Sequence, residues 1–442
     1  MKLLAAFTTV LYVAAAVPFN APTIANINDI SLEVRGQGDN LPAGNWNAGW
    51  LADLLTKIKD TVQKNKNKGS IPKASQFTSW KTFKGNGVNL GGWLAIEKGI
   101  DPKFFNDNGA SAAVDEDSFC AVLGKIKCAL LLEYRYATFF KTSDIDLYAS
   151  YGVNVLRIPV SYWAFMPAVN GDHYHTGSQL FHMARIANYA ISKGMHIIVD
   201  LHGLPGGQNG LDNQGKTGDL NWWNNQTNFD YSMKTVDLAT TWILKQPRPE
   251  QFTLGLINEP LKQGFYFFGQ TLDSVDYLNK YYTAAVSQIR KRTAKVPIML
   301  SDGFAGPQIW EPVWANSNQN IVIDTHIYFF SQGTYAYDAP YDACYLAKSY
   351  QVSTNPVFIG EWSIQASKFN SGDVPTRSLF YNSQLAAYLK FLAGGSFWNA
   401  KHFGDVIVGT DGTDQSNFWS WEKLAQQGVV VKAGVPVDTA TC

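Results

Sequence analysis

The feature of this 442-residue sequence that most constrains its fold is a regular alternation of short apolar runs with longer segments of helical spacing, which begins near residue 86. Each apolar run has the length of a strand and ends in polar or glycine residues. Eight runs follow one another: GVNLGG (87–92), VNVLRIP (153–159), HIIVDLHG (196–203), TLGLINEP (253–260), PIMLSDG (297–303), IVIDTHIY (321–328), VFIGEWS (357–363) and GGSFWN (394–399). Strands that alternate with helices pair in parallel through crossover connections. Eight such units predict an α/β fold of the closed (β/α)8 type, the TIM barrel.

Polar side chains gather at the ends of these predicted strands. In a (β/α)8 barrel the carboxyl ends of all strands meet at one mouth, where active sites form. The residues expected there are Arg157, His202, Asn258, Glu259, Asp302, His326, Tyr328, Glu361, Trp362 and Trp398. A strand-end cap or a satisfied core histidine can explain any one of them. So many on separate strands indicate a single active site.

Two glutamates stand out among these residues. Glu259 follows an apolar run and precedes Pro260, and Glu361 also ends an apolar run, directly before Trp362. A buried carboxylate is costly unless it is paired or hydrogen-bonded. Two carboxyl groups about 5–5.5 Å apart across a barrel mouth can hydrolyse a glycosidic bond with retention of configuration, one as nucleophile and one as acid and base. Arg157 can keep the nucleophile ionised through a charge-assisted hydrogen bond.

Charge and spacing argue against other classes of protein. Lys+Arg and Asp+Glu both number 36, so no bulk charge attracts nucleic acid or an anionic membrane. His202 and His326 stand on separate predicted strands without an HExxH or CxxC pattern, which argues against a metal hydrolase. We expect no metal and no cofactor. The 14 Trp, 21 Tyr and 26 Phe are mostly core residues, but some can stack on sugar rings in a cleft.

The N-terminal stretch MKLLAAFTTVLYVAAAVP has the pattern of a secretory leader. It has an early Lys2, an apolar stretch and the small residues of Ala14-x-Ala16. Residues 1–16 are therefore predicted to be a signal peptide, cleaved near Ala16. We expect a secreted protein, either extracellular or in the cell wall.

Secretion changes the interpretation of two further patterns. Four cysteines in an oxidising compartment favour two disulfides, with three possible connectivities. They are Cys120, Cys128, Cys344 and Cys442. Asn225 begins the sequence Asn-Gln-Thr, which becomes a glycosylation site in a secreted chain.

Several motifs occur in a specific order along the predicted strands. LRIP, DLHG, NEP and GEW lie within the longer segments GVNLGGWL, LRIPVSYWAF, VDLHGLPGGQNGLDNQG, GLINEPL, DTHIYF, IGEWS and FWNAK. NEP alone is a weak motif, but the four in this order and at these spacings are highly specific. In these segments the sequence resembles glycoside hydrolase family 5, and within it the fungal-type secreted exo-β-1,3-glucanases, over about residues 84–425.

The resemblance implies roles for individual residues. It makes Glu259 of NEP the acid/base and Glu361 of GEW the nucleophile. It also implies a set of sugar contacts, which are Arg157, His202, Asn258, His326, Tyr328 and Trp398. We add Asn209, Asp212 and Trp163 as candidate substrate-binding residues, with a core position as the alternative for Trp163. The resemblance points to a disulfide between Cys344 and Cys442, and we expect Cys120 to pair with nearby Cys128.

The sequence departs from the family pattern beside the site. Leu211 stands in QNGLDNQG where the family usually has an aromatic residue, and Ala400 stands where a second Trp often occurs. Residues 402–415 are longer than usual. We expect this loop and residues 202–223 to wall off a pocket around the terminal sugar.

We therefore expect a lead-in, residues 17–84, packed on one catalytic domain, residues 85–442. The expected activity is release of glucose from the non-reducing ends of β-1,3-glucans by double displacement, with transglycosylation as a second outcome. The alternatives are an endo-acting family 5 glycanase, such as a cellulase or an endo-β-1,6-glucanase, and a catalytically silent carbohydrate-binding wall protein. The presence of both glutamates argues against the silent protein. We expect a monomer whose partner is the glucan substrate.

Overall fold

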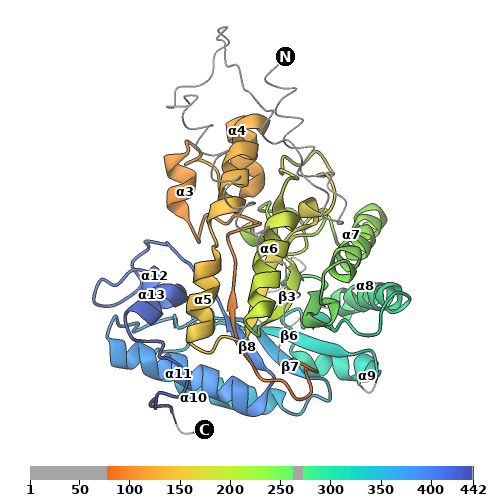
Figure 1. Ribbon diagram of the computed structural model, residues 1–442. Coiled ribbons are helices and arrows are strands. Elements are labelled where there is room, and N and C mark those ends of the chain that lie inside the picture. Colours follow the sequence, from red (N-terminus) through yellow and green to blue (C-terminus); the bar gives the residue numbers. More distant parts are fainter. Residues whose placement is uncertain (1–76, 262–271, 316, 441) are drawn as a thin grey trace.

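Eight parallel strands close into a barrel in chain order (Figure 1). The computed structural model describes residues 77–261, 272–315, 317–440 and 442, so the predicted signal peptide and most of the predicted lead-in lie outside the described residues. The strands are β1 (Gly85–Asn89), β2 (Val155–Val160), β3 (His196–Leu201), β4 (Phe252–Gly255), β5 (Ile298–Ser301), β6 (Ile321–Ile327), β7 (Val357–Trp362) and β8 (Gly394–Phe397). The last strand returns to the first, with Gly394 beside Gly85. Each predicted run overlaps one strand, and the predicted (β/α)8 barrel is confirmed.

The strands form where both faces of the chain can be buried. Every residue of β2 and of β3 is buried. Such near-continuous apolar runs are typical of parallel strands that side chains cover on both faces. β4 is short, because the chain leaves the ladder before Asn258 and Glu259.

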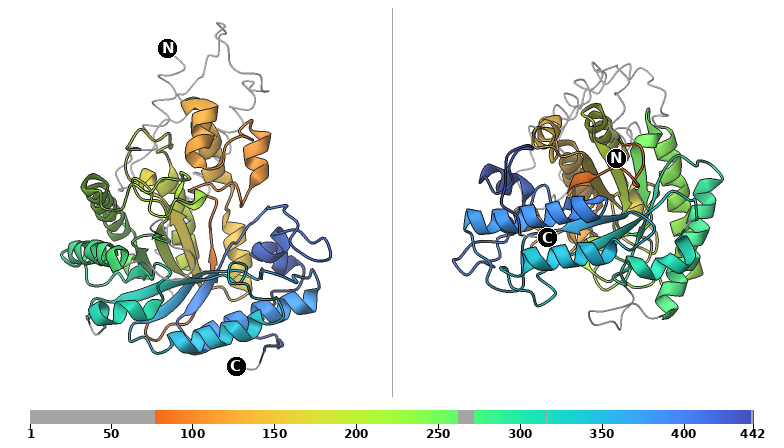
Figure 2. Two further views of the ribbon diagram at one scale, coloured as in Figure 1. Left: turned by 180° about the vertical axis from the view of Figure 1, so that it is seen from behind. Right: turned by 90° about the horizontal axis from the view of Figure 1, so that it is seen from below.

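Helices surround the barrel (Figure 2). They are α3 (Pro102–Asp107), α4 (Glu116–Thr138), α5 (Thr142–Ser150), α6 (Gln179–Ser192), α7 (Gln226–Leu244), α8 (Leu272–Arg290), α9 (Glu311–Trp314), α10 (Ala339–Tyr350), α11 (Val374–Phe391), α12 (Ser416–Trp419) and α13 (Trp421–Gln426). Among the described residues, none of these helices has the length and apolar character that a membrane crossing requires. α3 and α4 stand at the end of the barrel toward which β1 runs (Figure 1).

Aromatic side chains close the opposite, amino-terminal end of the barrel. Phe77, Trp80 and Phe83 pack with the first residues of several strands in one buried cluster. The Trp80 indole N–H donates to the Thr253 hydroxyl at 2.9 Å, and Phe77 stacks on His196 at 3.6 Å. This end is sealed, so a substrate must enter from the carboxyl end. The division into lead-in and catalytic domain stays a prediction.

Two disulfides fix the periphery, and both predicted pairings are confirmed. Cys120 is bonded to Cys128 within α4. A continuous helix would separate these Cα atoms by about 12 Å. Gly124, with a φ of 74°, interrupts the helix between them, and the Cα atoms lie 4.9 Å apart. Cys344 on α10 is bonded to the terminal Cys442.

Candidate active site

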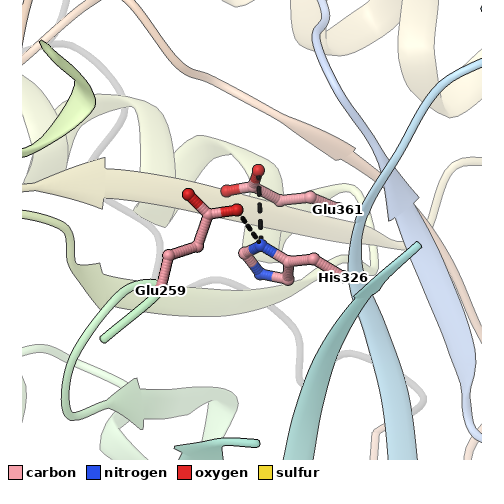
Figure 3. A group of neighbouring side chains, drawn as sticks. All are labelled: Glu259, His326 and Glu361. Atoms are coloured by element: carbon pink, nitrogen blue, oxygen red, sulfur yellow. Dashed lines mark hydrogen bonds and ion pairs between the residues drawn. The ribbon is translucent and has the colours of Figure 1, made fainter. Parts of the chain in front are cut away.

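Glu259 and Glu361 face each other at the carboxyl end of the barrel, with His326 between them (Figure 3). One oxygen of each carboxylate and one ring nitrogen of His326 all lie within 4.8 Å of one another. Retaining glycosidases hold their two carboxyl groups about 5–5.5 Å apart, whereas inverting enzymes need about 6.5–9.5 Å for a water molecule. The pair therefore has the separation that a direct nucleophilic attack requires.

Irregular backbone positions both glutamates. Glu259 has a φ of 44°, in the left-handed region that non-glycine residues rarely adopt. The Asn258 N–H before it donates to the carbonyl of Leu201 at 3.1 Å, which ties this turn to the end of β3. Around Glu361, the pairing of β7 shifts register with β6 and with β8. Such bulges re-aim side chains at barrel rims, and backbone strain of this kind concentrates at functional sites.

Arg157 orients Glu361 from within β2. Its side chain is fully buried, and Nη1 lies 2.7 Å from Glu361 Oε1. Nη2 donates to Asn258 Oδ1 at 2.8 Å and lies 3.1 Å from Asp200 Oδ2. Burial lowers the pKa of Arg157, but the charges of Asp200, Glu361 and Asp324 outweigh burial and raise it. The guanidinium is therefore a permanent cation beside one oxygen of Glu361.

The second oxygen of Glu361 accepts a hydrogen bond from Tyr328, at 2.8 Å from the hydroxyl. Burial and the charge of Glu361 raise the pKa of Tyr328 well above its ordinary value, so the hydroxyl keeps its proton. Burial raises the pKa of Glu361 overall, with a further contribution from the charge of Glu259, although the charges of His326 and Arg157 act in the opposite direction. Both oxygens accept from fixed donors, which favours the ionised carboxylate.

Glu259 is held by a different pair of donors. Its Oε1 lies 2.8 Å from His326 Nδ1, and its Oε2 accepts from Asn213 Nδ2 at 2.7 Å. Burial raises the pKa of Glu259, but the hydrogen bond and the charge of His326 lower it overall. Burial lowers the pKa of His326, yet Glu361 and Asp324 raise it well above its ordinary value. The bond between His326 and Glu259 thus holds one proton that can move toward the glutamate.

His202 and Trp398 lie with their rings parallel at the ends of β3 and β8. Asp200 Oδ2 lies 2.7 Å from His202 Nδ1, and the His202 ring lies parallel to Trp398 at 5.6 Å, with 6° between the planes. Trp398 directly follows β8, and its ring packs on Gly91, the first glycine of the pair in GVNLGGW. A Cβ on Gly91 would lie 2.6 Å from this ring. Gly91 therefore makes room for the tryptophan.

The sequence prediction missed Glu97, in the loop after β1. It is buried, its Oε1 lies 3.9 Å from His202 Nε2, and no donor for that oxygen occurs among the described residues. Burial, followed by the charges of Asp212, Glu361 and Glu259, raises the pKa of Glu97 well above its ordinary value. A buried polar group normally has a partner. A substrate hydroxyl would supply one here.

The loop after β3 supplies further contacts, only some of which were predicted. Asn213, which the prediction omitted, lies inside QNGLDNQG. Asn209 does not reach the glutamates: its side chain bonds Asn213 Oδ1 at 3.0 Å and accepts from the Leu211 N–H at 2.9 Å, so it shapes the loop. Asp212 is half-buried, and burial, with the charges of Asp115 and Glu259, raises its pKa. Its predicted contact with a sugar stays a prediction.

Trp163 requires a correction. The structure places it in a buried cluster with Ala95, Tyr162 and Met166. Its ring is fully buried and stacks on Tyr174 at 3.8 Å, with 6° between the planes. Trp163 is therefore a core residue, as the alternative interpretation proposed. Tyr174 already covers one of the ring faces on which a sugar would stack.

Three further predictions concern the surroundings of the site. Asn225 is half-buried at the N-cap of α7, and its glycosylation stays a prediction. In the 402–415 loop, the Thr410 N–H donates to the carbonyl of Asn370 at 2.8 Å, so this loop packs on the loop after β7. Its role as a pocket wall stays a prediction. The absence of a metal also stays a prediction, because the donor atoms of Glu259, His326 and Glu361 are close enough for a cation to bridge them, although the charge of Arg157 opposes one.

Comparison with known proteins identifies the family. The family model for cellulase (glycosyl hydrolase family 5) matches residues 126–394. Glucan 1,3-beta-glucosidase 1 of Schizosaccharomyces pombe is 32% identical over 362 residues, which are 74% of this chain and 84% of that protein. A probable glucan 1,3-beta-glucosidase A of Aspergillus clavatus is 34% identical over 338 residues, 74% of this chain and 75% of that protein.

A solved structure adds a full-length match. The crystal structure of rutinosidase from Aspergillus niger superposes with a TM-score of 0.76 at 35% identity, covering 80% of this chain and 100% of that one. Both glutamates lie within the residues that the family model matches. The chain belongs to glycoside hydrolase family 5.

Proposed function

We propose that the protein is a retaining β-glucosidase that releases glucose from the non-reducing ends of β-1,3-glucans. The observation that carries the chemistry is the pair Glu259 and Glu361, with oxygens within 4.8 Å of each other and different donors on each. The relatives named glucan 1,3-beta-glucosidase support the linkage.

In the first step, a Glu361 oxygen attacks the anomeric carbon while the bond from that carbon to the leaving oxygen breaks. Glu259 gives a proton to the leaving oxygen. As Glu361 becomes a neutral ester, His326 loses the carboxylate that does most to raise its pKa. The proton on the His326–Glu259 hydrogen bond moves across 2.8 Å to the glutamate as that charge disappears, and from there it passes to the leaving oxygen. His326 is then neutral and Glu259 is ionised, ready to act as the base.

In the second step, Glu259 takes a proton from water, the oxygen of that water attacks the anomeric carbon, and the ester to Glu361 breaks. Arg157 and Tyr328 receive the restored carboxylate at 2.7 and 2.8 Å, in the geometry that they hold before reaction. Two inversions leave the released glucose in the β configuration. A sugar hydroxyl in place of water gives transglycosylation.

We infer that two buried polar groups without partners bind the sugar. Asn258 Nδ2 has no acceptor within the described part of the chain, although its Oδ1 bonds Arg157. Hydrogen bonds to the sugar 2-hydroxyl that strengthen in the transition state are typical of glycosidases. We assign this contact to Asn258 and a contact with a more distant hydroxyl to Glu97.

Trp398→Ala should lower kcat/KM by at least about tenfold, or about 1.4 kcal/mol of transition-state binding, because the sugar loses a stacking surface. Steady-state kinetics on an aryl β-glucoside measure this effect. Trp398→Phe serves as the matched variant and should recover part of the loss. Unchanged kinetics in a normally folded Trp398→Ala protein would return this residue to the core.

Product analysis on laminarin over time tests the proposed function. We expect glucose from the first minutes, before shorter oligosaccharides accumulate. A ladder of oligosaccharides would instead indicate the endo-acting alternative. Anomeric analysis of the first product by NMR should show the β form, and an initial α product would contradict retention.

A second candidate is a rutinosidase-type activity. The match that covers the whole Aspergillus niger rutinosidase supports it, as does Leu211, which is 44% exposed where related glucanases usually carry an aromatic residue. Parallel kcat/KM measurements on rutin and on laminarin separate the two. A clear preference for rutin would replace the glucan in our proposal.

We also propose that the protein is secreted and monomeric. Two disulfides suit an oxidising compartment, and the predicted leader and the Asn225 sequon agree with export. N-terminal sequencing of the mature protein and mass spectrometry of the peptide containing Asn225 test export and glycosylation.

A further inference from the structure

Three exposed aromatic side chains touch one another on the surface, and we call them the aromatic platform: Tyr335, Tyr337 and Phe369. Tyr337 is 59% exposed and Phe369 is 56% exposed. The ring of Tyr335 lies 5.4 Å from Tyr337 and 5.3 Å from Phe369, and the last two rings lie 6.1 Å apart. Soluble monomers rarely leave such contiguous apolar surface without a binding role.

The platform belongs to the two loops that leave the catalytic strands. Tyr335 and Tyr337 follow β6, which carries His326, and Phe369 follows β7, which carries Glu361. Hydrogen bonds join the loops: the Ala336 N–H donates to the Lys368 carbonyl at 3.0 Å, and the Ser367 N–H donates to the Thr334 carbonyl at 3.0 Å. The platform is thus built as one unit on the catalytic face.

Aromatic contacts lead from the catalytic carboxylate toward the platform. Tyr328, which donates to Glu361, stacks on Trp419 at 5.2 Å. Phe330 lies 5.4 Å from both rings and is 41% exposed. The Ser367 hydroxyl donates to the carbonyl of Phe330 at 2.8 Å, which links it to the loop that carries Phe369.

We propose that the aromatic platform binds the glucan chain beyond the bond that is cleaved. This inference rests on the proposed function and extends it, because it concerns the polymer and not the terminal sugar. Flat ring faces stack on the C–H faces of sugars, and the tyrosine hydroxyls can bond sugar hydroxyls. Lys368, whose Nζ lies 5.9 Å from the centre of the Tyr335 ring, adds a polar donor at the edge. The continuity with the site favours the substrate over a second copy of this chain.

The double variant Tyr337→Ala/Phe369→Ala tests the platform. Its KM for laminarin should rise about five- to tenfold with little change in kcat, because two exposed stacking surfaces are lost. Hydrolysis of a small aryl β-glucoside, which is too short to reach the platform, should stay within about twofold of wild type. The control is Phe181→Ala, because Phe181 is 41% exposed on α6. This variant should keep the wild-type KM and kcat on both substrates.

Binding without turnover separates this inference from the proposed function. In a Glu361→Gln background, a laminarin-containing gel should retard the protein, and the platform substitutions should reduce that retardation. Equal retardation with and without the platform overturns the inference, and so does an equal loss of activity on both substrates. A dimer in size-exclusion chromatography that the double variant abolishes assigns the face to a second copy. A wild type that binds laminarin but does not hydrolyse it overturns the proposed function and leaves the binding result to decide the platform.

Discussion

Glu361→Gln should lower kcat by about 10⁴-fold or more on both laminarin and an aryl β-glucoside, which corresponds to about 5.5 kcal/mol of barrier. The amide cannot form the ester with the anomeric carbon, so an activated leaving group gives no relief. The side chain keeps its shape, and Arg157 keeps Asp200 at 3.1 Å and Asp324 at 3.5 Å as counter-charges. Folding should therefore survive the substitution.

The control for this variant is Glu250→Gln, because Glu250 is a surface glutamate whose carboxylate lies 3.6 Å from Arg248 and whose side chain is 39% exposed. Both variants should melt near the wild-type temperature, and only Glu361→Gln should lose activity. A fluorinated slow substrate should label the wild-type peptide that contains Glu361, as detected by mass spectrometry. A label on another residue, or more than a tenth of wild-type kcat in Glu361→Gln, would remove Glu361 from the nucleophile role.

The strands and the two glutamates are predictable because their physical signals are local in sequence. Barrel strands are buried on both faces, so they appear as short apolar runs. A carboxylate at the end of such a run is costly to bury unless it is paired or hydrogen-bonded, which draws attention to Glu259 and Glu361. The disulfide within α4 is less obvious, because cysteines eight residues apart meet only where Gly124 interrupts the helix.

The remaining contacts of the site depend on folding and carry no local signal. Glu97 follows the apolar residues 93–96 but lies in a loop after β1 and not at a strand end, and only the closed barrel brings it to 3.9 Å from His202. Trp163 follows a strand end, as a mouth residue would, but the chain turns it under the loop after β3 and against Tyr174. The register shift between Thr325 and His326, which sets the ring against both glutamates, cannot be read from alternation alone.

Which glutamate is the nucleophile and which is the acid/base can be tested without relying on the size of a rate loss. Glu259→Ala should lower kcat on laminarin by about 10³-fold, because the poor leaving oxygen loses its proton donor. A dinitrophenyl glucoside needs no such proton, so its first step should stay fast. The ester on Glu361 should then accumulate, since water has lost the base that activates it.

Azide should relieve that block, because it attacks without a base and because removal of the Glu259 side chain opens space beside His326 and Asn213. The ester occupies the α face of the sugar, so azide must arrive from the β face and give the β-glucosyl azide. In a matched Glu361→Ala variant no ester forms, and azide must displace the leaving group directly from the α face, giving the α-glucosyl azide. NMR of the two products reads the roles from stereochemistry. If Glu259→Ala gave the α product and Glu361→Ala the β product, the assignments of nucleophile and acid/base would have to be exchanged.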